Sequence, residues 1–389
     1  MNSSGASLPM ATAEAAIATA NEDRTRDLSH MRAALALARR NLGQVWPNPS
    51  VGCVIVNNGR VVGRGWTQRG GRPHAETEAL ARAGNAAKDA TAYVGLEPCS
   101  HHGKTPPCAD ALIAAGIARV VIAVEDPDPR VSGAGAARLR AAGIAVDIGP
   151  CRAEADELNA GFFCRIQHGR PLVTLKLATS LDGRIATATG VSRWITGPAA
   201  RERAHLLRAM HDAVLVGTGT ALADDPQLTC RLPGLEQRSP VRVVIDGHLR
   251  LPATLRLFTE TDQVPTWLAT LKSADPARQE ALTAQGVKII FAEPDAEGGV
   301  NLAAFLRRLG DEGLTRLLVE GGGRLAAALL RAGLVARLIW MRAPLIIGSD
   351  GVPAIADLGL GDLATAPRFA LLSRELVGGD VIDTYRRAD

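Results

Sequence analysis

The sequence predicts an α/β protein of two domains, and three observations carry this prediction. The chain has 389 residues, whereas single domains usually contain about 100 to 200. Helical and strand-like patterns alternate from about Asp27 onward, which is typical of sheets covered by helices on both faces. The alternation is interrupted by QHGRP (167–171) and then begins again. We therefore expect a flexible tail at 1–26, a first domain at 27–169 and a second domain at 170–389.

The elements of the first domain follow from apolar periodicity. Residues 31–42 have a helical pattern, and 51–66 predict a β-hairpin because two β-branched runs flank an Asn-Asn-Gly turn. Residues 74–84 predict a helix that ends at Gly84. Further strands are expected at 91–98 and 119–126, and further helices at 108–117 and 135–144.

The second domain begins with an expected strand at 171–180. Its later strands are short apolar runs, which suit a sheet that is buried on both faces. These strands are expected at 213–217, 241–246, 287–291, 317–321 and 337–348.

Composition argues against a nucleic-acid-binding or membrane protein. The formal net charge is only +4 and aromatic residues are 3% of the chain, so neither a basic groove nor stacking platforms for bases are expected. No run approaches the ~18 consecutive apolar residues of a membrane span. The N-terminal residues lack the basic and apolar regions of a secretory signal, so we expect a cytoplasmic protein that acts on small molecules.

A cluster of histidine, glutamate and cysteine residues predicts a catalytic zinc site. An H-A-E motif is followed by E-P-C and a later cysteine, and the expected ligands are His74, Cys99 and Cys108. One imidazole and two thiolates leave a fourth zinc position open for water, whose pKa the metal lowers toward neutrality. Glu76 is expected to pass a proton from that water to a departing amine.

The spacing of the cysteines leaves an alternative open. Eight residues separate Cys99 from Cys108, whereas the usual zinc-deaminase pattern is C-x-x-C. His101 or His102 therefore remains a possible ligand in place of Cys108. Two unrelated buried cysteines and a surface histidine are the plainer interpretation, but the H-x-E and E-P-C context disfavours it.

Glycines in the second domain suggest a phosphate site. The strand at 317–320 runs into three glycines at 321–323 and then a helix, so backbone N–H groups can converge on a phosphate. No acidic residue follows about twenty positions later to hold a ribose, which weakens an ordinary NAD-type interpretation. A structural tight turn remains an alternative.

Two arginines and an acidic turn in the second domain are ambiguous from the residues alone. Arg208 and Arg231 suit either a solvated surface or bidentate bonds to a substrate phosphate. Asp224-Asp225-Pro226 has the composition of an ordinary polar turn.

Motifs in the first half resemble the deaminase half of the bifunctional deaminase/reductase family of riboflavin biosynthesis. The matching segments are PNPSVGCVIV (47–56), GGRPHAETEAL (70–80), LEPCSHHGKTPPC (96–108) and EDPDPRVSGAG (125–135). In that family the long loop between the cysteines is the normal form. The resemblance implies a cytidine-deaminase-like α/β/α domain with Asn48 at the pyrimidine. Trp46 departs from the family pattern, in which histidine precedes Pro-Asn-Pro.

Motifs in the second half resemble the reductase half of the same family, so that the resemblance covers about residues 27–385. The matching segments are KLATSLDGRIA (176–186), SRWIT (192–196), GTGTALADDPQLTCR (217–231), VEGGGRLAAALL (319–330) and APLIIGSDG (343–351). The resemblance implies a dihydrofolate-reductase-like α/β fold, NADPH as the cofactor, and a homodimer. Gly247 departs from the family pattern, in which serine follows V-I-D and contacts the cofactor.

The resemblance also implies residue roles in the reductase. The NADPH contacts implied are Ala178, Trp194, Thr220, Asp224, Gly322, Gly323, Arg324, Leu325, Ala326, Ala327 and Ala328. The substrate contacts implied are Ser192, Arg208, Leu228, Arg231 and Glu320, with Lys176 and Asp182 as helpers.

The implied reactions are a zinc-dependent deamination and an NADPH-dependent reduction. The first replaces the 2-amino group of 2,5-diamino-6-(5-phosphoribosylamino)pyrimidin-4(3H)-one with oxygen. The second reduces the ribosyl group of 5-amino-6-(5-phosphoribosylamino)uracil to a ribityl chain. Two rival functions are a nucleic-acid-editing deaminase, which needs a basic groove, and a non-catalytic zinc module, which needs a closed four-ligand site.

Overall fold

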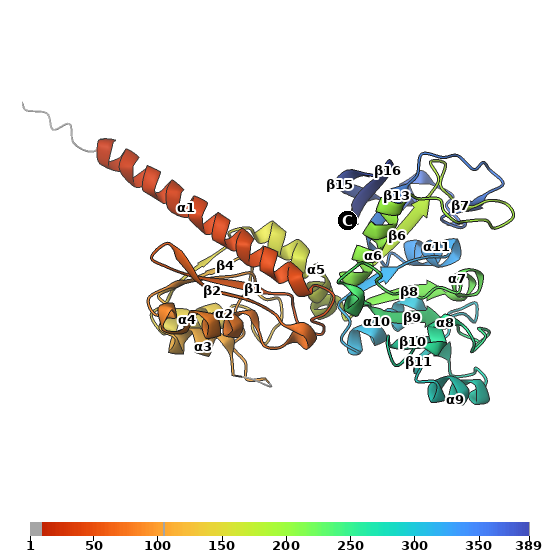
Figure 1. The fold of residues 1–389 in the computed structure, drawn as a ribbon, viewed down its shortest axis with the longest axis horizontal. Coiled ribbons are helices and arrows are strands. Elements are labelled where there is room, and N and C mark those ends of the chain that lie inside the picture. Colours follow the sequence, from red (N-terminus) through yellow and green to blue (C-terminus); the bar gives the residue numbers. More distant parts are fainter. Residues whose placement is uncertain (1–9, 104–105, 389) are drawn as a thin grey trace, which may run out of the picture. The chain divides into compact units, whose positions relative to one another are not determined.

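The structure, a computed structural model, describes residues 10–103 and 106–388, with side chains from Asn21 onward. Two compact units are present (Figure 1). The first contains the chain up to Asn41 together with Asn48–Ala160, and the second contains Leu42–Pro47 together with Gly161–Asp389. The division therefore falls inside helix α5 rather than at the sequence-predicted boundary after Gly169.

The first unit is a three-layer α/β/α structure around a five-stranded sheet (Figure 1). Its helices are α1 (Met10–Ala38), α2 (Ala75–Ala83), α3 (Cys108–Ala114), α4 (Ala134–Ala141) and the first part of α5 (Arg152–His168), and its strands are β1 (Gly52–Asn57), β2 (Arg60–Trp66), β3 (Thr91–Val94), β4 (Arg119–Ile122) and β5 (Ala145–Ile148). The strand order is β2-β1-β3-β4-β5, in which β1 runs antiparallel to β2 and β3 and the other pairs are parallel. The predicted hairpin is confirmed, with Asn58 and Gly59 both at positive φ.

Glycines on β2 allow α2 to lie directly against the sheet. A Cβ atom at Gly65 would lie 2.0 Å from the Ala75 carbonyl oxygen, and one at Gly63 would lie 2.3 Å from the Ala79 carbonyl oxygen. No side chain fits at either position unless α2 moves away from β2. The position of the N-terminus of α2, where His74 and Glu76 lie, therefore depends on these glycines.

Helix α1 begins earlier than the sequence predicted. The expected helix started at Met31, after a flexible tail at 1–26, whereas α1 begins at Met10. The alanine-rich sequence of this segment has a high intrinsic helix propensity, which explains the longer helix. Near its middle, Asp27 accepts hydrogen bonds from the Tyr93 hydroxyl and the Arg119 guanidinium, which attach α1 to β3 and β4. Residues 1–9 of the expected tail lie outside the described residues.

The second unit is built on a nine-stranded mixed sheet. Its helices are α6 (Pro198–Ala209), α7 (Thr218–Asp224), α8 (Arg256–Thr259), α9 (Pro276–Ala284), α10 (Leu302–Asp311) and α11 (Gly323–Arg331). Its strands are β6 (Leu172–Thr179), β7 (Arg184–Ala186), β8 (Ala213–Gly217), β9 (Val241–Ile245), β10 (Thr266–Leu271), β11 (Lys288–Ala292), β12 (Arg316–Val319), β13 (Val335–Arg342), β14 (Val352–Pro353), β15 (Phe369–Val377) and β16 (Asp380–Arg387).

The order of the nine strands is β11-β10-β9-β8-β12-β6-β13-β16-β15. The first seven are parallel to one another, and β16 and β15 add an antiparallel edge. Buried aliphatic side chains from β6, β8, β9, β12, α10 and α11 contribute to one core cluster of this unit. The carboxyl ends of β8, β12 and β6 meet at one edge of the sheet, which is where ligands bind in open α/β sheets.

The segment Leu42–Pro47 packs within the second unit. The Arg238 guanidinium donates to the Leu42 carbonyl oxygen, and the Trp46 ring meets the edge of the Trp267 ring at a centroid distance of 6.2 Å. Trp46, where the family resemblance implied a histidine, is therefore a packing residue of this unit.

Candidate active sites

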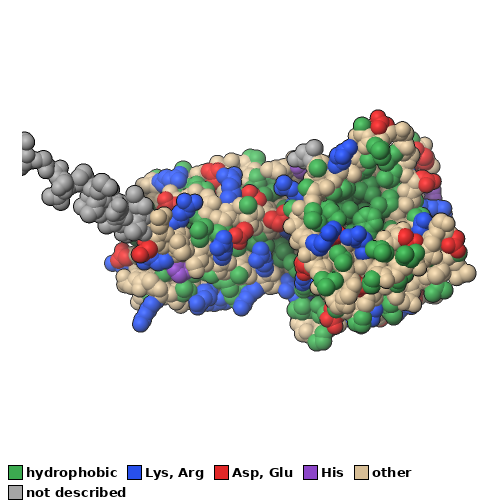
Figure 2. Space-filling view, turned by 90° about the horizontal axis from the view of Figure 1, so that it is seen from above, with side chains coloured by type: hydrophobic (Ala, Val, Ile, Leu, Met, Phe, Trp, Pro, Cys, Tyr) green, Lys and Arg blue, Asp and Glu red, His purple; other side chains and the backbone are tan. Residues whose placement is uncertain are grey.

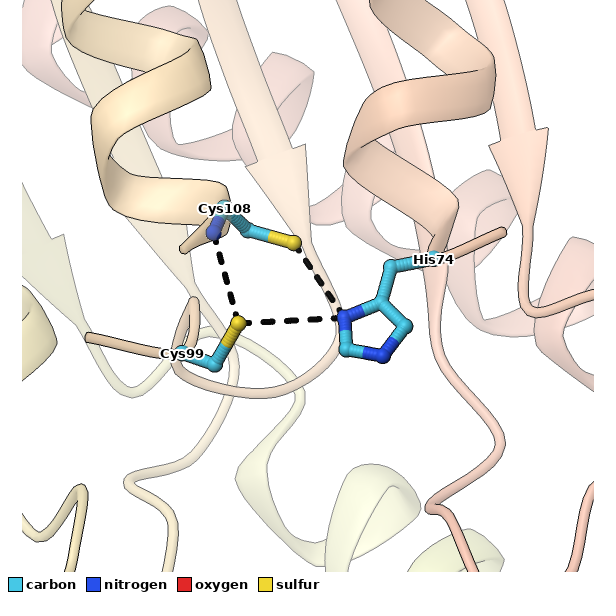
Figure 3. Close-up of side chains that lie close together, drawn as sticks. All are labelled: His74, Cys99 and Cys108. Atoms are coloured by element: carbon cyan, nitrogen blue, oxygen red, sulfur yellow. Dashed lines mark hydrogen bonds between the residues drawn. The ribbon is translucent and has the colours of Figure 1, made fainter. Parts of the chain in front are cut away.

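Three potential metal ligands converge in the first unit from the ends of three different segments. His74 is the N-cap residue of α2, Cys99 lies in the loop after β3, and Cys108 is the first residue of α3. Their ligand atoms all lie within 4.8 Å of one another (Figure 3). His74 Nδ1 is 3.3 Å from Cys108 Sγ and 3.8 Å from Cys99 Sγ.

This cluster fits zinc. Tetrahedral zinc with usual bond lengths places its nitrogen and sulfur ligands about 3.6 Å apart, close to both distances here. Among the described residues the group has three members, and neither His101 nor His102 belongs to it. A set of one imidazole and two thiols leaves a coordination position for water, as in catalytic rather than structural zinc sites.

The two cysteine thiols differ in pKa because they contact each other. The Cys108 N–H group donates to Cys99 Sγ at 3.3 Å. The hydrogen bond from the Cys108 thiol, together with His74, lowers the pKa of Cys99 to about 4, and the same contact raises the pKa of Cys108. Cys99 is therefore a thiolate at neutral pH, the form in which sulfur binds metals.

Glu76 lies in the first turn of α2 and is 4% exposed. It interacts with all three ligands, and its burial raises its pKa. A carboxyl group with a raised pKa beside a metal-bound water suits proton transfer near neutral pH.

The connection between β4 and α4 is held by a carboxylate close to Cys99 in the sequence. Glu97 accepts hydrogen bonds from the backbone N–H groups of Asp126, Gly133 and Ala136 at 3.0 to 3.2 Å. Asp126 is itself buried, which raises its pKa to about 7, and it was not among the residues predicted from the sequence. Its position in the E-D-P-D-P motif, shortly after β4, was the available signal. Asn48 donates to the Gly71 carbonyl oxygen in the loop that leads to α2.

The second unit contains a buried ion pair at the carboxyl end of β12. Arg208 on α6 donates from Nε and Nη2 to the two carboxylate oxygens of Glu320, at 2.6 and 2.9 Å. Burial alone would raise the pKa of Glu320, but Arg208 outweighs it and lowers that pKa to about 2. Lys176 on β6 lies next to this pair, and burial lowers its pKa although Glu320 opposes the shift.

The glycine-rich turn after β12 faces α7. A Cβ atom at Gly321 or Gly322 would lie 3.2 Å from the Thr220 hydroxyl oxygen, and Gly322 has φ 82° as the N-cap residue of α11. The turn thus presents bare backbone at a helix N-terminus, a form that fits the pyrophosphate of a dinucleotide. Ala326 and Ala327 are 1% exposed, so their side chains pack in the core.

Other expected contacts gather around the same edge of the sheet. Trp194 is 66% exposed and stacks on the Arg201 guanidinium, while Arg193 donates to the Asp224 carbonyl oxygen. Asp182 accepts hydrogen bonds from the backbone N–H groups of Ile347 and Gly348 and so holds that loop.

The remaining expected residues differ in exposure. Leu228 has φ 55° and is 3% exposed, and its side chain packs in a hydrophobic cluster. Ala178 and Ser192 are half-buried, and Arg324 is exposed on the first turn of α11.

Known proteins match both units. The family model for the RibD C-terminal domain matches residues 171–382, and the model for the cytidine and deoxycytidylate deaminase zinc-binding region matches residues 24–124. The chain is 45% identical to riboflavin biosynthesis protein RibD of Escherichia coli over 367 residues, which cover 92% of this chain and 98% of that protein. The chain belongs to the RibD family. It therefore combines a zinc-dependent deaminase with an NADPH-dependent reductase of riboflavin biosynthesis.

Further relatives and solved structures agree with the family. The corresponding protein of Aquifex aeolicus is 42% identical, with 93% of this chain and 98% of that protein covered. A solved structure of Acinetobacter baumannii RibD superposes with a TM-score of 0.85 at 38% identity, over 94% of this chain and all of that chain. A deaminase/reductase structure from Thermotoga maritima gives a TM-score of 0.82 at 34% identity, with 94% of this chain and 100% of that chain covered. The expected pairing of deaminase-like and reductase folds is confirmed. Among the described helices, none combines the length and the apolar composition of a membrane-spanning segment.

Proposed function

We propose that the first unit deaminates 2,5-diamino-6-(5-phosphoribosylamino)pyrimidin-4(3H)-one, with water replacing the 2-amino group by oxygen and ammonia leaving. The observation that carries this proposal is the three-ligand cluster of His74, Cys99 and Cys108 with Glu76 buried beside it. When bound, zinc supplies Lewis-acid activation of the attacking water. Glu76 takes a proton from that water and delivers it to the departing ammonia, while Asn48 orients the pyrimidine ring.

The second unit, in this proposal, reduces the ribosyl group of 5-amino-6-(5-phosphoribosylamino)uracil to ribityl. NADPH supplies the hydride. The protein contributes mainly by holding the nicotinamide of the cofactor close to the sugar of the substrate in a fixed orientation. This effect relies on rigid contacts such as the Arg208–Glu320 pair. Lys176 and Asp182 support this arrangement, the first beside the ion pair and the second through the loop it holds.

The proposed contacts of the reductase divide into two sets. The cofactor set is Ala178, Trp194, Thr220, Asp224 and the turn and first helical residues Gly322, Gly323, Arg324, Leu325, Ala326, Ala327 and Ala328. The substrate set is Ser192, Arg208, Leu228, Arg231 and Glu320. Leu228, Ala326 and Ala327 are almost fully buried, so in this proposal they shape the walls of the two sites rather than offer exposed polar groups.

The direct test is incubation of the zinc-loaded protein with the diaminopyrimidine substrate, with and without NADPH. Ammonia is expected in both samples and oxidation of NADPH only in the second. Absence of ammonia release in both would contradict the proposed first step. Ammonia release without any NADPH oxidation would contradict the second. A parallel assay on single-stranded RNA and DNA is expected to show no deamination.

We further propose that the protein is a homodimer that associates through the reductase unit. Strand β15 ends the nine-stranded sheet, and Leu371, Leu372 and Leu376 on it are 51%, 44% and 77% exposed. Figure 2 shows hydrophobic side chains gathered on the visible face of this unit. An exposed apolar edge strand favours pairing with another chain.

Light scattering tests the dimer. The protein is expected to have twice the mass of one chain, and Leu376→Lys to shift it toward the monomer. Leu363→Lys, at an exposed leucine outside β15, is the matched control and should remain dimeric. A monomer at every concentration would contradict the proposal.

We also propose a cytoplasmic location and two functional domains, at 27–169 and 170–389. Expressing each segment alone and assaying its activity tests the two domains.

A further inference from the structure

One face of helix α6 carries a row of basic side chains. Arg201, His205 and Arg208 are spaced by four and three residues, so they lie on the same side of the helix. Arg208 is held by Glu320, and Arg201 stacks on Trp194. His205, between them, is not used by the functions described so far.

His205 contacts the segment that carries Arg231. Its Nδ1 atom is 3.3 Å from the backbone nitrogen of Arg231 and 3.1 Å from the carbonyl oxygen of Thr229. The backbone N–H of Arg231 can only donate, so Nδ1 accepts this bond when it carries no proton. Arg208 meanwhile donates from Nη1 to the same Thr229 carbonyl oxygen at 3.0 Å. Neighbouring residues of α6 therefore fix both ends of the segment 229–231.

The side chain of Arg231 depends on this backbone attachment for its position. It is exposed, and its own side-chain contacts, to Gln227 and Thr229, are long at 3.5 Å. A guanidinium held so loosely gains little from its own contacts. Its position then depends on the backbone of the segment 229–231, in which the hydrogen bond to His205 is the one made by Arg231 itself.

We propose that His205 is a positioning residue for substrate recognition, which accepts the Arg231 backbone hydrogen bond and thereby aims the Arg231 guanidinium at the phosphate of the phosphoribosylamino substrate. This inference rests on the proposed function, which assigns Arg231 to the substrate. His205 itself does not contact the reacting atoms.

The charges around His205 favour the form that the role requires. The groups that face it are Arg208 on its own helix, Arg231 with the Thr229 carbonyl on the opposing segment, and Glu320 at the end of β12. Burial, Arg208 and Arg231 lower its pKa, and this effect outweighs that of Glu320, which raises it. These charges favour the neutral ring, and the role requires the neutral tautomer that carries its proton on Nε2, so that Nδ1 can accept from Arg231. Protonation in acid would turn Nδ1 into a donor to Thr229 and release the Arg231 N–H group.

Two substitutions separate positioning from simple packing. His205→Leu keeps a side chain of similar size but removes the acceptor. His205→Asn places an oxygen near the position of Nδ1 and cannot titrate. The KM for the phosphorylated substrate is expected to rise about fivefold to tenfold in His205→Leu, the usual value of one hydrogen bond, and to stay within about twofold in His205→Asn. The KM for NADPH and kcat are expected to change little in both. His168→Leu, at an exposed histidine of the same unit, is the control.

Two further readouts test the link to the phosphate. With the dephosphorylated substrate, His205→Leu and the unsubstituted protein are expected to have the same kcat/KM. As pH falls below the lowered pKa of His205, the KM for the phosphorylated substrate should rise more steeply in the unsubstituted protein than in His205→Asn. Titration of the phosphate itself cancels in this comparison.

The outcomes distinguish the inference from its premise. If Arg231→Gln leaves the substrate KM unchanged, the assignment of Arg231 to the phosphate is wrong and the inference falls with it. If Arg231→Gln raises KM and His205→Leu does not, only the inference is overturned. An equal loss in His205→Leu for phosphorylated and dephosphorylated substrates would also overturn it, because that result indicates general damage to the unit.

Discussion

The two units hold their charged groups by different means. In the first, three ligands at the ends of separate segments surround the position of one metal ion, and the nearby carboxyl group of Glu76 stays buried with a raised pKa. In the second, no metal cluster occurs among the described residues, and a guanidinium and a carboxylate neutralise each other in the interior. The first arrangement depends on a dissociable ion, whereas the second depends on an ion pair that forms with the fold. Substitutions and metal removal should therefore affect the two units separately.

The largest expected effect is on the deaminase alone. Glu76→Gln removes the group that transfers the proton, so the rate of ammonia release is expected to fall about a thousandfold. Reduction of 5-amino-6-(5-phosphoribosylamino)uracil should be unchanged. Glu78→Gln, two positions along the same helix at a residue that pairs with Arg82 on the surface, is the control and should retain both activities. An Glu76→Gln variant that loses both activities equally would contradict the separation of the units.

The second prediction concerns the buried ion pair. Arg208→Ala removes the hydrogen-bonded partner of the buried Glu320 and leaves only Lys176 as a nearby cation on the strands, a change that typically costs about 3 to 5 kcal/mol in the free energy of unfolding. It should also raise the substrate KM sharply. The control is Arg203→Ala, on the same helix as Arg208. It breaks an exposed ion pair with Glu375 on β15, which is worth at most about 1 kcal/mol. Denaturant unfolding of the two variants provides the comparison. An equal loss of unfolding free energy in the two variants would show that burial does not increase the contribution of the Arg208–Glu320 pair to stability.

These two sites differ in how far the sequence could predict them. The H-x-E and E-P-C motifs were enough to predict a zinc site with His74 and Cys99, but the choice of Cys108 over the nearby histidines required the fold. Arg208 and Glu320 are 112 residues apart, and no spacing rule connects an arginine on a helix to a glutamate after a strand. The motif resemblance assigned both to the substrate, but their mutual pairing required the fold.

The fold shows the same contrast between local and distant information. The hairpin of β1 and β2 followed from its turn residues. Strand β10 was missed because its buried threonines, Thr266 and Thr270, interrupt the apolar run by which other buried strands were predicted. Strand β15 was missed for a different reason, since its central residues are exposed on both faces and show no alternation. The eight-residue spacing between the cysteines had left His101 or His102 open as a ligand. Only the structure, in which Cys108 joins His74 and Cys99, excludes them from the cluster.

The third prediction uses pH to probe the reductase unit. His211 lies between the Leu207 carbonyl and the Thr174 hydroxyl, and burial lowers its pKa to about 4. Because the unfolded chain binds the proton near pH 6.5 and the folded chain does not, stability is full above pH 6.5 and is lost progressively down to about pH 4. The loss is expected to reach about 3 kcal/mol.

Urea unfolding at pH 4.5 and 7 measures this loss, followed by tryptophan fluorescence because four of the five tryptophans lie in the second unit. In His211→Gln, the free energy of unfolding should differ less between pH 4.5 and pH 7 than it does in the unsubstituted protein, by the amount that His211 contributes. An undiminished difference would assign the acid sensitivity to other groups.

The smallest expected effect tests how β2 positions the zinc ligands. Gly65→Ala places a methyl group 2.0 Å from the Ala75 carbonyl oxygen and must push the N-terminus of α2 outward. Overpacking of this kind typically costs about 1 to 3 kcal/mol, and here part of the cost should appear as weaker zinc binding. Gly59→Ala, in the open hairpin turn, introduces no such contact and serves as the control for zinc affinity. Unchanged zinc affinity in Gly65→Ala would show that α2 is positioned by other contacts.

The most direct test of the two-site account is removal of zinc from the intact protein. One zinc ion per chain is expected in the purified protein, and its removal by a chelator should abolish ammonia release while reduction of the deaminated substrate by NADPH continues at its original rate. Readdition of zinc should restore ammonia release. Full deaminase activity in the metal-free protein, or loss of the reductase together with the metal, would contradict the account.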